Sequence, residues 1–411
     1  MNKLLYYIKD RLVRLVPLVN RLILLKLKCK STINVVFFAM SVSMWRYQGL
    51  YDIMRANKRF RVFIVIQPSL AYSQEQQAKD TADLIDYFSS QNIPFVLGTN
   101  IGGQVYNIKK EISPDILFYP QPYNDYYPKE LSYNRFYNKL LCYYPYAFWT
   151  GSGDWSYDQP LHRMAWKLFY PTVMHKEDFF HYFRKSANVE VVGFPSADDF
   201  LFKNHHYVWK QPSKKKKIIW APHFTILPGG LVKQSNFLWM ADVMLEIADT
   251  YSDQIQIVFK PHPRLFTELV NHQEWGLEKT VEYYKKWDRL ENAKVELGGF
   301  VNLFMTSDAM IHDCGSFAVE YHYTGNPVMY IAEHFEEQLE EKNSFGKLAM
   351  GLHYVGKNRK DIIDFIENVV IGGVDQMSSH RKQFMEEYLI PPGGKTVAEN
   401  TLAVLIKELS W

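Results

Sequence analysis

Residues 307–321 read SDAMIHDCGSFAVEY, and this stretch decides the fold class. Its apolar run AMI predicts a short buried strand. A turn that contains Gly315 follows, and the residues after the turn predict a helix that begins at about Ser316. A strand, a tight turn and a helix in this order are typical of the α/β units around a parallel sheet.

The same alternation continues on both sides of this stretch. Runs of β-branched and aromatic residues predict further buried strands, and the stretches between them show helical patterns. Strands are expected at 33–40, 61–68, 114–121, 139–149, 217–224, 255–261, 308–313 and 326–333, and helices at 73–88, 237–251 and 396–409.

The length of 411 residues exceeds what one hydrophobic core usually organises, so two domains are expected. We predict an α/β fold with one Rossmann-like domain over residues 31–205 and a second over residues 214–390. The run of four lysines at 214–217 is a composition shift typical of a domain joint. Residues 391–411 are expected to form a last helix that packs back on the first domain.

The composition excludes several classes of protein. A hydrophobic fraction of 47% with 22% charged residues is that of a globular protein. A net charge of +3, with no zinc-finger, RNA-recognition or basic-zipper pattern, argues against a nucleic-acid partner. The three cysteines are odd in number and far apart, which favours free thiols in a reducing, cytoplasmic compartment. We find no metal-ligand motif and predict no metal site.

Residues 1–30 carry eight lysines and arginines against one acid, Asp10. Arg14 and Arg21 interrupt the apolar residues too early for a spanning helix, and a signal-peptide cleavage site is absent. We predict a basic amphipathic helix, kinked at Pro17, that lies on an anionic membrane surface; the alternative is a helix packed on the body of the protein. Its apolar face would hold Ile8, Leu12, Leu15, Val19, Leu22 and Leu25.

Three motifs that carry chemistry follow predicted strands. In the first, two prolines stiffen a turn that presents Lys260, His262 and Arg264, which suits a pyrophosphate. In the second, the turn before Ser316 offers unpaired backbone N–H groups to a phosphate, and Glu320, four residues on, can hold a ribose hydroxyl. The alternative is that Ser316 only caps the helix.

The third motif is Ala-Pro-His-Phe, in which His223 can stabilise charge on a departing phosphate or shuttle a proton. Two further segments are weaker signals. The turn that starts at Gly193 has only the turn-forming residues that any turn shows. The glycine-containing segment 150–154 lacks the spacing of a phosphate loop.

The three motifs, in this order, resemble the carboxyl-terminal half of the CDP-glycerol glycerophosphotransferases of teichoic-acid and capsule synthesis. The resemblance covers about residues 218–332. It implies a GT-B fold whose two domains, for acceptor and donor, face each other across a cleft. It also implies peripheral attachment to the inner face of the cell membrane. The implied reaction transfers glycerol phosphate from CDP-glycerol to a lipid-linked or saccharide acceptor and releases CMP, with no cofactor beyond the donor.

The resemblance also implies roles for single residues. His262 and Arg264 would contact the donor diphosphate, and Asp313 and Ser316 fall on an aspartate and a serine of the family. Glu320 falls on its downstream acid, and Gly315 stands where the family commonly has another serine. The predicted donor-binding set is Lys260, Arg264, Asp313, Gly315, Ser316, Phe317 and Glu320.

The first half departs from the family, which usually places a His-Gly-Thr segment with a candidate base after a strand. Here that strand ends in the segment 144–148, Tyr-Pro-Tyr-Ala-Phe. Tyr146, Asp154 and His162 are candidate replacements, so the predicted catalytic residues are His262, His223, Tyr146 and Asp154. The alternatives are a GT-B glycosyltransferase that uses a nucleotide sugar and a catalytically silent nucleotide-binding scaffold.

Overall fold

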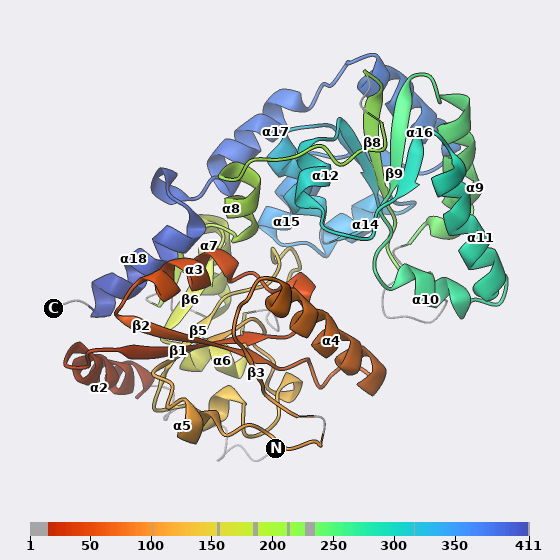
Figure 1. Ribbon diagram of the computed structural model, residues 1–411. Coiled ribbons are helices and arrows are strands. Elements are labelled where there is room, and N and C mark those ends of the chain that lie inside the picture. Colours follow the sequence, from red (N-terminus) through yellow and green to blue (C-terminus); the bar gives the residue numbers. More distant parts are fainter. Residues whose placement is uncertain are drawn as a thin grey trace. The chain divides into compact units, whose positions relative to one another are not determined.

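The structure, a computed structural model, describes residues 15–100, 102–153, 157–183, 188–211, 214–226, 235–315 and 317–409. The chain divides into two compact units (Figure 1). The first unit comprises the residues up to Asp198 together with those from Ile390 onward, and the second comprises Asp199–Leu389. Each unit is built on one sheet, and every strand pairing is parallel. The predicted fold of two α/β units is confirmed.

The sheet of the first unit has seven strands in the order β3-β2-β1-β4-β5-β6-β7, the Rossmann order with one strand added. Of the predicted strands, the one at 139–149 is shorter than expected, because the chain turns away from the sheet just before Pro145. The strands are β1 (Ile33–Ala39), β2 (Phe60–Ile66), β3 (Val96–Leu97), β4 (Ile116–Tyr119), β5 (Leu140–Tyr143), β6 (Lys167–Tyr170) and β7 (Val189–Val191).

Helices complete the first unit. Ser73 starts the long α4 by accepting a hydrogen bond from the Gln76 N–H, as the sequence pattern predicts. One face of the sheet packs an apolar core that includes Val36 and Leu117, and the other face stacks aromatic rings such as Phe37 on Phe118, 4.6 Å apart. The helices are α2 (Val16–Lys28), α3 (Gln48–Ala56), α4 (Gln74–Ser90), α5 (Ile108–Glu111), α6 (Pro160–Met164), α7 (Val173–Phe183) and α18 (Val397–Leu409), and α8 (Ser196–Leu201) spans the division between the units.

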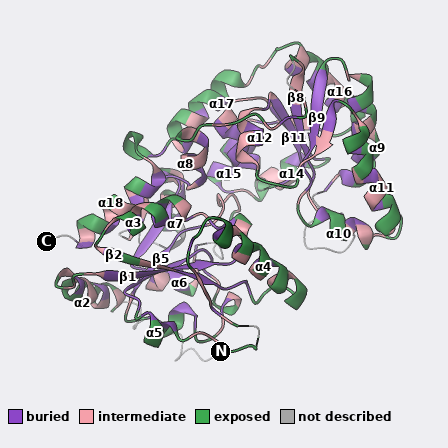
Figure 2. Ribbon diagram, in the orientation of Figure 1, coloured by how far each residue is buried: buried purple, intermediate pink, exposed green. Residues whose placement is uncertain are grey.

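The sheet of the second unit has six strands in the order β10-β9-β8-β11-β12-β13, again the Rossmann pattern. Helices cover the sheet, and its strands β9, β11 and β12 are buried along their whole length (purple in Figure 2). Trp220 lies at the centre of the larger core. The strands are β8 (Lys216–Ala221), β9 (Ile255–Phe259), β10 (Ala293–Val295), β11 (Ala309–His312), β12 (Val328–Ile331) and β13 (Tyr354–Gly356).

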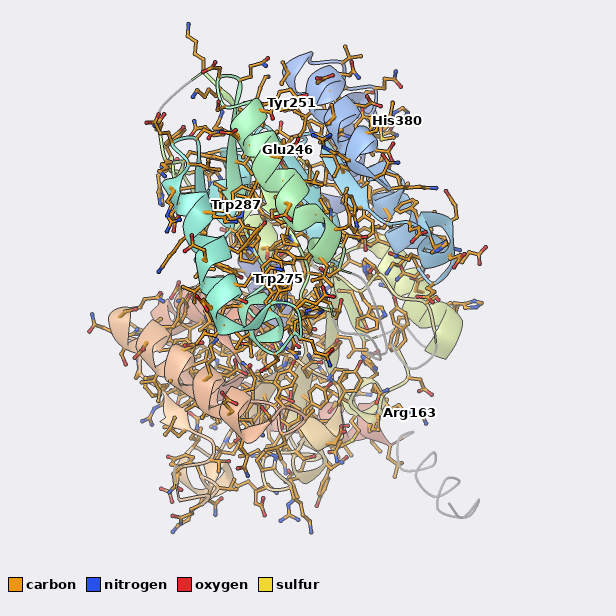
Figure 3. The ribbon with its side chains drawn as sticks, turned by 90° about the vertical axis from the view of Figure 1, so that its right-hand side faces the viewer. Arg163, Glu246, Tyr251, Trp275, Trp287 and His380 are labelled. Atoms are coloured by element: carbon orange, nitrogen blue, oxygen red, sulfur yellow. The ribbon has the colours of Figure 1, made fainter. Side chains whose placement is uncertain are left out.

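The helices of the second unit cover its sheet. Trp287 of α11 packs 5.5 Å from the Trp220 ring, and Glu246 of α9 forms an ion pair with Arg359 (Figure 3). Tyr251, at the end of α9, hydrogen-bonds a glutamate of the π-helical segment that follows α16. The helices are α9 (Phe237–Thr250), α10 (Leu265–Val270), α11 (Gly276–Arg289), α12 (Val301–Met305), α13 (Phe317–Glu320), α14 (Phe335–Glu340), α15 (Ser344–Met350), α16 (Arg359–Asp364) and α17 (Ser378–Phe384).

The chain passes into the second unit earlier than the lysine run suggests. The segment before that run is bound to the second unit: Trp209 donates its indole N–H to Thr306, and the Lys210 ammonium contacts the carbonyls of Asp288 and Leu290. The division therefore falls after Asp198 rather than near residue 205. Composition marks a polar surface segment here, while hydrogen bonds decide to which unit it belongs.

The last helix, α18, belongs to the first unit. The Asp198 carboxylate accepts hydrogen bonds from the N–H groups of Val397 and Ala398, so it caps the start of this helix. Near the other end, Glu408 contacts the buried Lys167 ammonium at 2.8 Å. Both ends of the helix are thus fixed to the body of the unit.

The described part of the amino-terminal segment is helical from Val16, and Pro17 lies in the first turn, where a proline costs little. One side of α2 faces α18 and buries Leu27. The opposite side leaves four leucines exposed to half or more of their surface, with Leu18 in place of the predicted Val19: Leu15, Leu18, Leu22 and Leu25. The expected positions Ile8 and Leu12 lie outside the described residues.

Candidate active site

The second sheet brings the three predicted motifs together. β9, β8 and β11 are neighbours, so the turns after their carboxyl ends meet at one edge. The strand order reverses between β8 and β11, and open parallel sheets bind ligands at such a switch point. His223 follows β8, His262 follows β9 and Asp313 follows β11.

Asp313 ties this edge together through backbone groups. Its buried carboxylate accepts a hydrogen bond from the His223 N–H at 2.6 Å and one from the Asn236 N–H at 2.5 Å. Burial raises the pKa of Asp313 to about 6, although the bonds from Asn236 and His223 oppose that rise. Asp313 therefore fixes both the turn after β8 and the start of α9, and it positions other groups.

His223 and His262 form a pair whose ring centroids are 5.1 Å apart. Burial lowers the pKa of His223 to about 4, and the nearby Arg264 adds to this effect. Burial also lowers the pKa of His262 to about 3, with smaller electrostatic contributions from His223, Arg264 and Lys260. Both rings are therefore neutral at pH 7. His262 Nδ1 accepts the Arg264 N–H, so its proton is assigned to Nε2, which is left to donate.

The Arg264 side chain lies over an aromatic ring. Its guanidinium carbon is 4.2 Å from the centroid of the Phe224 ring, which in turn lies 4.4 Å from the His262 ring. Half of the arginine side chain is exposed, and one nitrogen contacts Glu268 at 2.8 Å. The arginine is thus held beside both histidines by a cation–π contact and an ion pair.

Lys260, which the sequence predicts to bind the donor, contacts backbone carbonyl groups in the structure. Its buried ammonium donates to the carbonyl oxygens of Gly298 at 2.6 Å and of Glu296 at 3.4 Å. Burial lowers its pKa to about 8, with Glu296 opposing that shift. In this structure the Lys260 ammonium therefore holds the loop after β10.

The turn after β11 leads into the helix that the sequence predicts, but this helix is short. α13 is one turn, Phe317–Glu320, and continues as a 3₁₀ helix, so the dipole at its start is small. A Cβ at Gly315 would meet no atom within 4 Å, so the missing serine is not a steric requirement. The Phe317 ring packs on α12, Glu320 is buried, and Ser316 lies outside the described residues.

The candidate bases of the first unit differ in their surroundings. His162 is buried among aromatic rings, its Nδ1 accepts the Gln159 N–H, and burial lowers its pKa to about 3, which fits a structural role. Burial raises the pKa of Tyr146, although a hydrogen bond with Gln121 and the charge of Arg46 act to lower it. The phenol therefore stays protonated at pH 7. Asp154 lies outside the described residues.

Sequence reasoning missed three residues that build the site. Thr225 hydrogen-bonds His223 Nδ1 at 2.9 Å, Asn236 fixes α9 to Asp313, and Phe224 holds Arg264. Phe224 is part of the quoted Ala-Pro-His-Phe motif, and Thr225 directly follows that motif, so both lay next to a residue that had been singled out. Asn236 is far from the motifs in sequence and had no such signal.

Two other features, a metal-binding cluster and a membrane-spanning helix, are absent from the described ranges. No group of three or more histidine, cysteine, aspartate or glutamate side chains there is arranged to hold a metal ion. No helix in the same part of the chain combines the length and apolarity that crossing a membrane requires. The three cysteines are free thiols, two of them buried.

The two units together define a GT-B type fold, and comparison with solved structures agrees. A putative UDP-N-acetylglucosamine 2-epimerase from Listeria monocytogenes matches with a TM-score of 0.62 at 16% identity, over 92% of this chain and 97% of that one. The wall teichoic acid polymerase TagF matches with a TM-score of 0.61 at 13% identity, over 100% of this chain and 98% of that one.

The epimerase from Neisseria meningitidis, bound to UDP-GlcNAc, matches with a TM-score of 0.58 at 12% identity, over 92% of this chain and all of that one. No protein-family model and no curated sequence matches. Structural neighbours thus include both a teichoic-acid polymerase and nucleotide-sugar epimerases, and at these identities they define the fold. The chain is a divergent example of it.

Proposed function

We propose that this protein is a transferase that moves a polyol phosphate, glycerol phosphate first, from a CDP-linked donor to a hydroxyl of a membrane-linked or saccharide acceptor. The observation that carries the proposal is the cluster of His223, His262 and Arg264 at the switch point of the second sheet. The likeness to TagF in fold, and the motifs in this same order, support it.

In the proposed reaction, the acceptor oxygen attacks the donor's β-phosphorus, the bond from that phosphorus to the bridging oxygen breaks, and CMP leaves. Charge accumulates on the leaving phosphate, where His262 Nε2–H and Arg264 would donate hydrogen bonds. His223 is neutral at pH 7, so it can take the proton that the acceptor hydroxyl loses. Because the histidines carry no charge before the donor arrives, Arg264 supplies the first attraction.

The test is turnover of CDP-glycerol, with product analysis for CMP and a new phosphodiester. His262→Ala should reduce turnover about a hundredfold or more while leaving the fold intact. The matched control is His334→Ala, an exposed histidine of the same unit, which should keep full turnover. Wild-type turnover in the His262 variant would overturn the assignment.

A nucleotide-sugar enzyme is the second candidate, favoured by the UDP-GlcNAc epimerases among the structural neighbours. The same diphosphate site would then serve attack at a sugar carbon or epimerisation of the sugar. A glycosidic bond or an altered sugar in the products would identify this class. Nucleotide binding without any turnover would instead favour the silent scaffold.

We further propose that α2 attaches the protein to the cytoplasmic face of an anionic membrane. Its exposed leucines form one stripe that Arg21 and Lys26 flank, the arrangement of an interfacial helix. Replacing Leu18 and Leu22 by serine should weaken sedimentation of the full chain with phosphatidylglycerol vesicles. Serine at the exposed Leu277 of α11 is the control and should change nothing. Equal sedimentation of all three proteins would refute the attachment.

A further inference from the structure

The first sheet has its own switch point, between β1 and β4. Two tyrosine hydroxyl groups fix the loop that follows β4. The Tyr127 hydroxyl donates a hydrogen bond to the Gln121 carbonyl at 3.0 Å, and the Tyr133 hydroxyl donates one to the Pro122 carbonyl at 3.2 Å. Gln121 is buried. This loop is therefore a fixed support at the edge where an open parallel sheet binds ligands.

Three half-buried tyrosines lie on this support. The rings of Tyr123 and Tyr126 are 4.9 Å apart and tilted by 45°, and the Tyr126 carbonyl accepts a hydrogen bond from the Leu70 N–H of the loop after β2. Tyr146, from the loop after β5, hydrogen-bonds Gln121. Burial, followed by the effects of Tyr126 and Tyr146, raises the pKa of Tyr123 to about 12, so its phenol stays protonated at pH 7.

The charges around these tyrosines disfavour an anionic ligand. Arg46 is the cation that faces Tyr146, and its Nε–H donates to the Tyr146 carbonyl at 3.2 Å. Asp125 is exposed in the same loop and opposes ionisation of both Tyr123 and Tyr126. A polymer of phosphodiesters would need several converging cations here. Neutral phenols and an amide instead suit a ligand with apolar faces and many hydroxyl groups.

We infer that Tyr123, Tyr126 and Tyr146, with Gln121, form a saccharide-binding platform that takes an uncharged sugar. The inference rests on the proposed function, since this sugar would be the acceptor. A pyranose ring would lie against Tyr123 and Tyr126, and its hydroxyl groups would exchange hydrogen bonds with the phenols and the amide. Of these residues, Tyr146 lies in segment 144–148, where the resemblance places a His-Gly-Thr segment, and in the platform it would bind and orient the sugar.

The experiment titrates the full chain with three probes: chitobiose as a neutral disaccharide, an oligomer of glycerol phosphate, and CDP. Saturation-transfer NMR and calorimetry measure binding. Tyr126→Ala should weaken chitobiose binding by about fivefold or more, the size of one aromatic contact. The matched control is Tyr137→Ala, a tyrosine of the same unit that is 69% exposed, and it should bind like the wild type.

The outcomes separate the two ideas. Chitobiose binding that falls in Tyr126→Ala, with CDP affinity unchanged, supports the platform and shows that the variant is folded. Preference for the glycerol phosphate oligomer, absence of chitobiose binding, or an equal loss in the Tyr137 variant overturns it. If CDP affinity falls in Tyr126→Ala, the tyrosines bind the nucleotide and the platform is refuted. If CDP fails to bind the wild type while chitobiose binds, the platform stands and the proposed function fails.

Discussion

Three buried histidines should make the second unit sensitive to acid. His312, His322 and His353 pack with ring centroids 4.9 to 5.3 Å apart, and in each ring one nitrogen bonds a backbone carbonyl. The other nitrogen of each ring is buried without a partner among the described residues. Burial lowers the pKa of all three; Arg381, buried nearby and paired with Asp375, also lowers the pKa of His322 and His353.

Proton linkage gives the sign and the size of the pH effect on the free energy of unfolding. A histidine whose pKa is lower in the folded state takes up its proton only on unfolding, so stability is full above pH 6.5 and falls as the pH falls toward the folded pKa. For His353, with a folded pKa of about 4, the loss between pH 7 and pH 5 is about 2 kcal/mol. Asp313, whose pKa is raised to about 6, opposes this with a gain of about 1 kcal/mol over the same range.

The assay is urea unfolding from pH 5 to pH 8, with hydrogen exchange of the β11–β13 peptides as the local readout. His353→Asn keeps an N–H that can reach the Ala349 carbonyl but cannot be protonated, so it should remove about one proton of uptake and flatten the slope. The control is His380→Asn, an exposed histidine (Figure 3), which should keep the slope. An unchanged slope in the His353 variant would refute the reasoning.

Three further predictions concern both units. Gly193→Ala should destabilise the docking of α18 by about 2 kcal/mol, seen as earlier proteolysis of the carboxyl terminus, because φ is +96° and the new Cβ would lie 2.9 Å from Val397. Lys167→Met should lower the free energy of unfolding by about 2 kcal/mol at pH 7, and by less at pH 4, because its two carboxylate partners lose their cation. CDP should bind more tightly at pH 5.5 than at pH 7, with proton uptake in calorimetry, because a diphosphate raises the low pKa of His223 and His262.

The fold was predictable because most of the buried parallel strands are runs of mainly apolar residues. The strands that the sequence analysis did not list include short ones with a weak signal: β3 has two residues, β10 and β13 have three each, and β6 begins with Lys167. Lys167 reads as a surface residue, yet it is buried because two carboxylates from distant segments reach it. No local pattern contains that information, since one partner, Glu408, is 241 residues away.

The position of the candidate site in the fold was predictable from the sequence. The binding partners of its residues were less predictable. Parallel strands bring their carboxyl ends to one edge, so three motifs after β8, β9 and β11 had to meet. The sequence shows that Lys260 and Asp313 are charged, but not whether their charges face a ligand or the backbone. In the structure, the first holds the carbonyls after β10 and the second holds two N–H groups. These partners become neighbours only when the chain folds.

The two switch points would offer the proposed transferase different chemical groups. The second unit holds two imidazoles neutral beside Arg264, so an anionic donor supplies the charge that makes them effective. The first unit offers protonated phenols, which orient a hydroxyl but do not remove its proton. Phosphoryl transfer through a loose transition state depends more on positioning and charge stabilisation than on a strong base. A transferase of the kind proposed would therefore depend more on its donor site than on a strong base in the first unit.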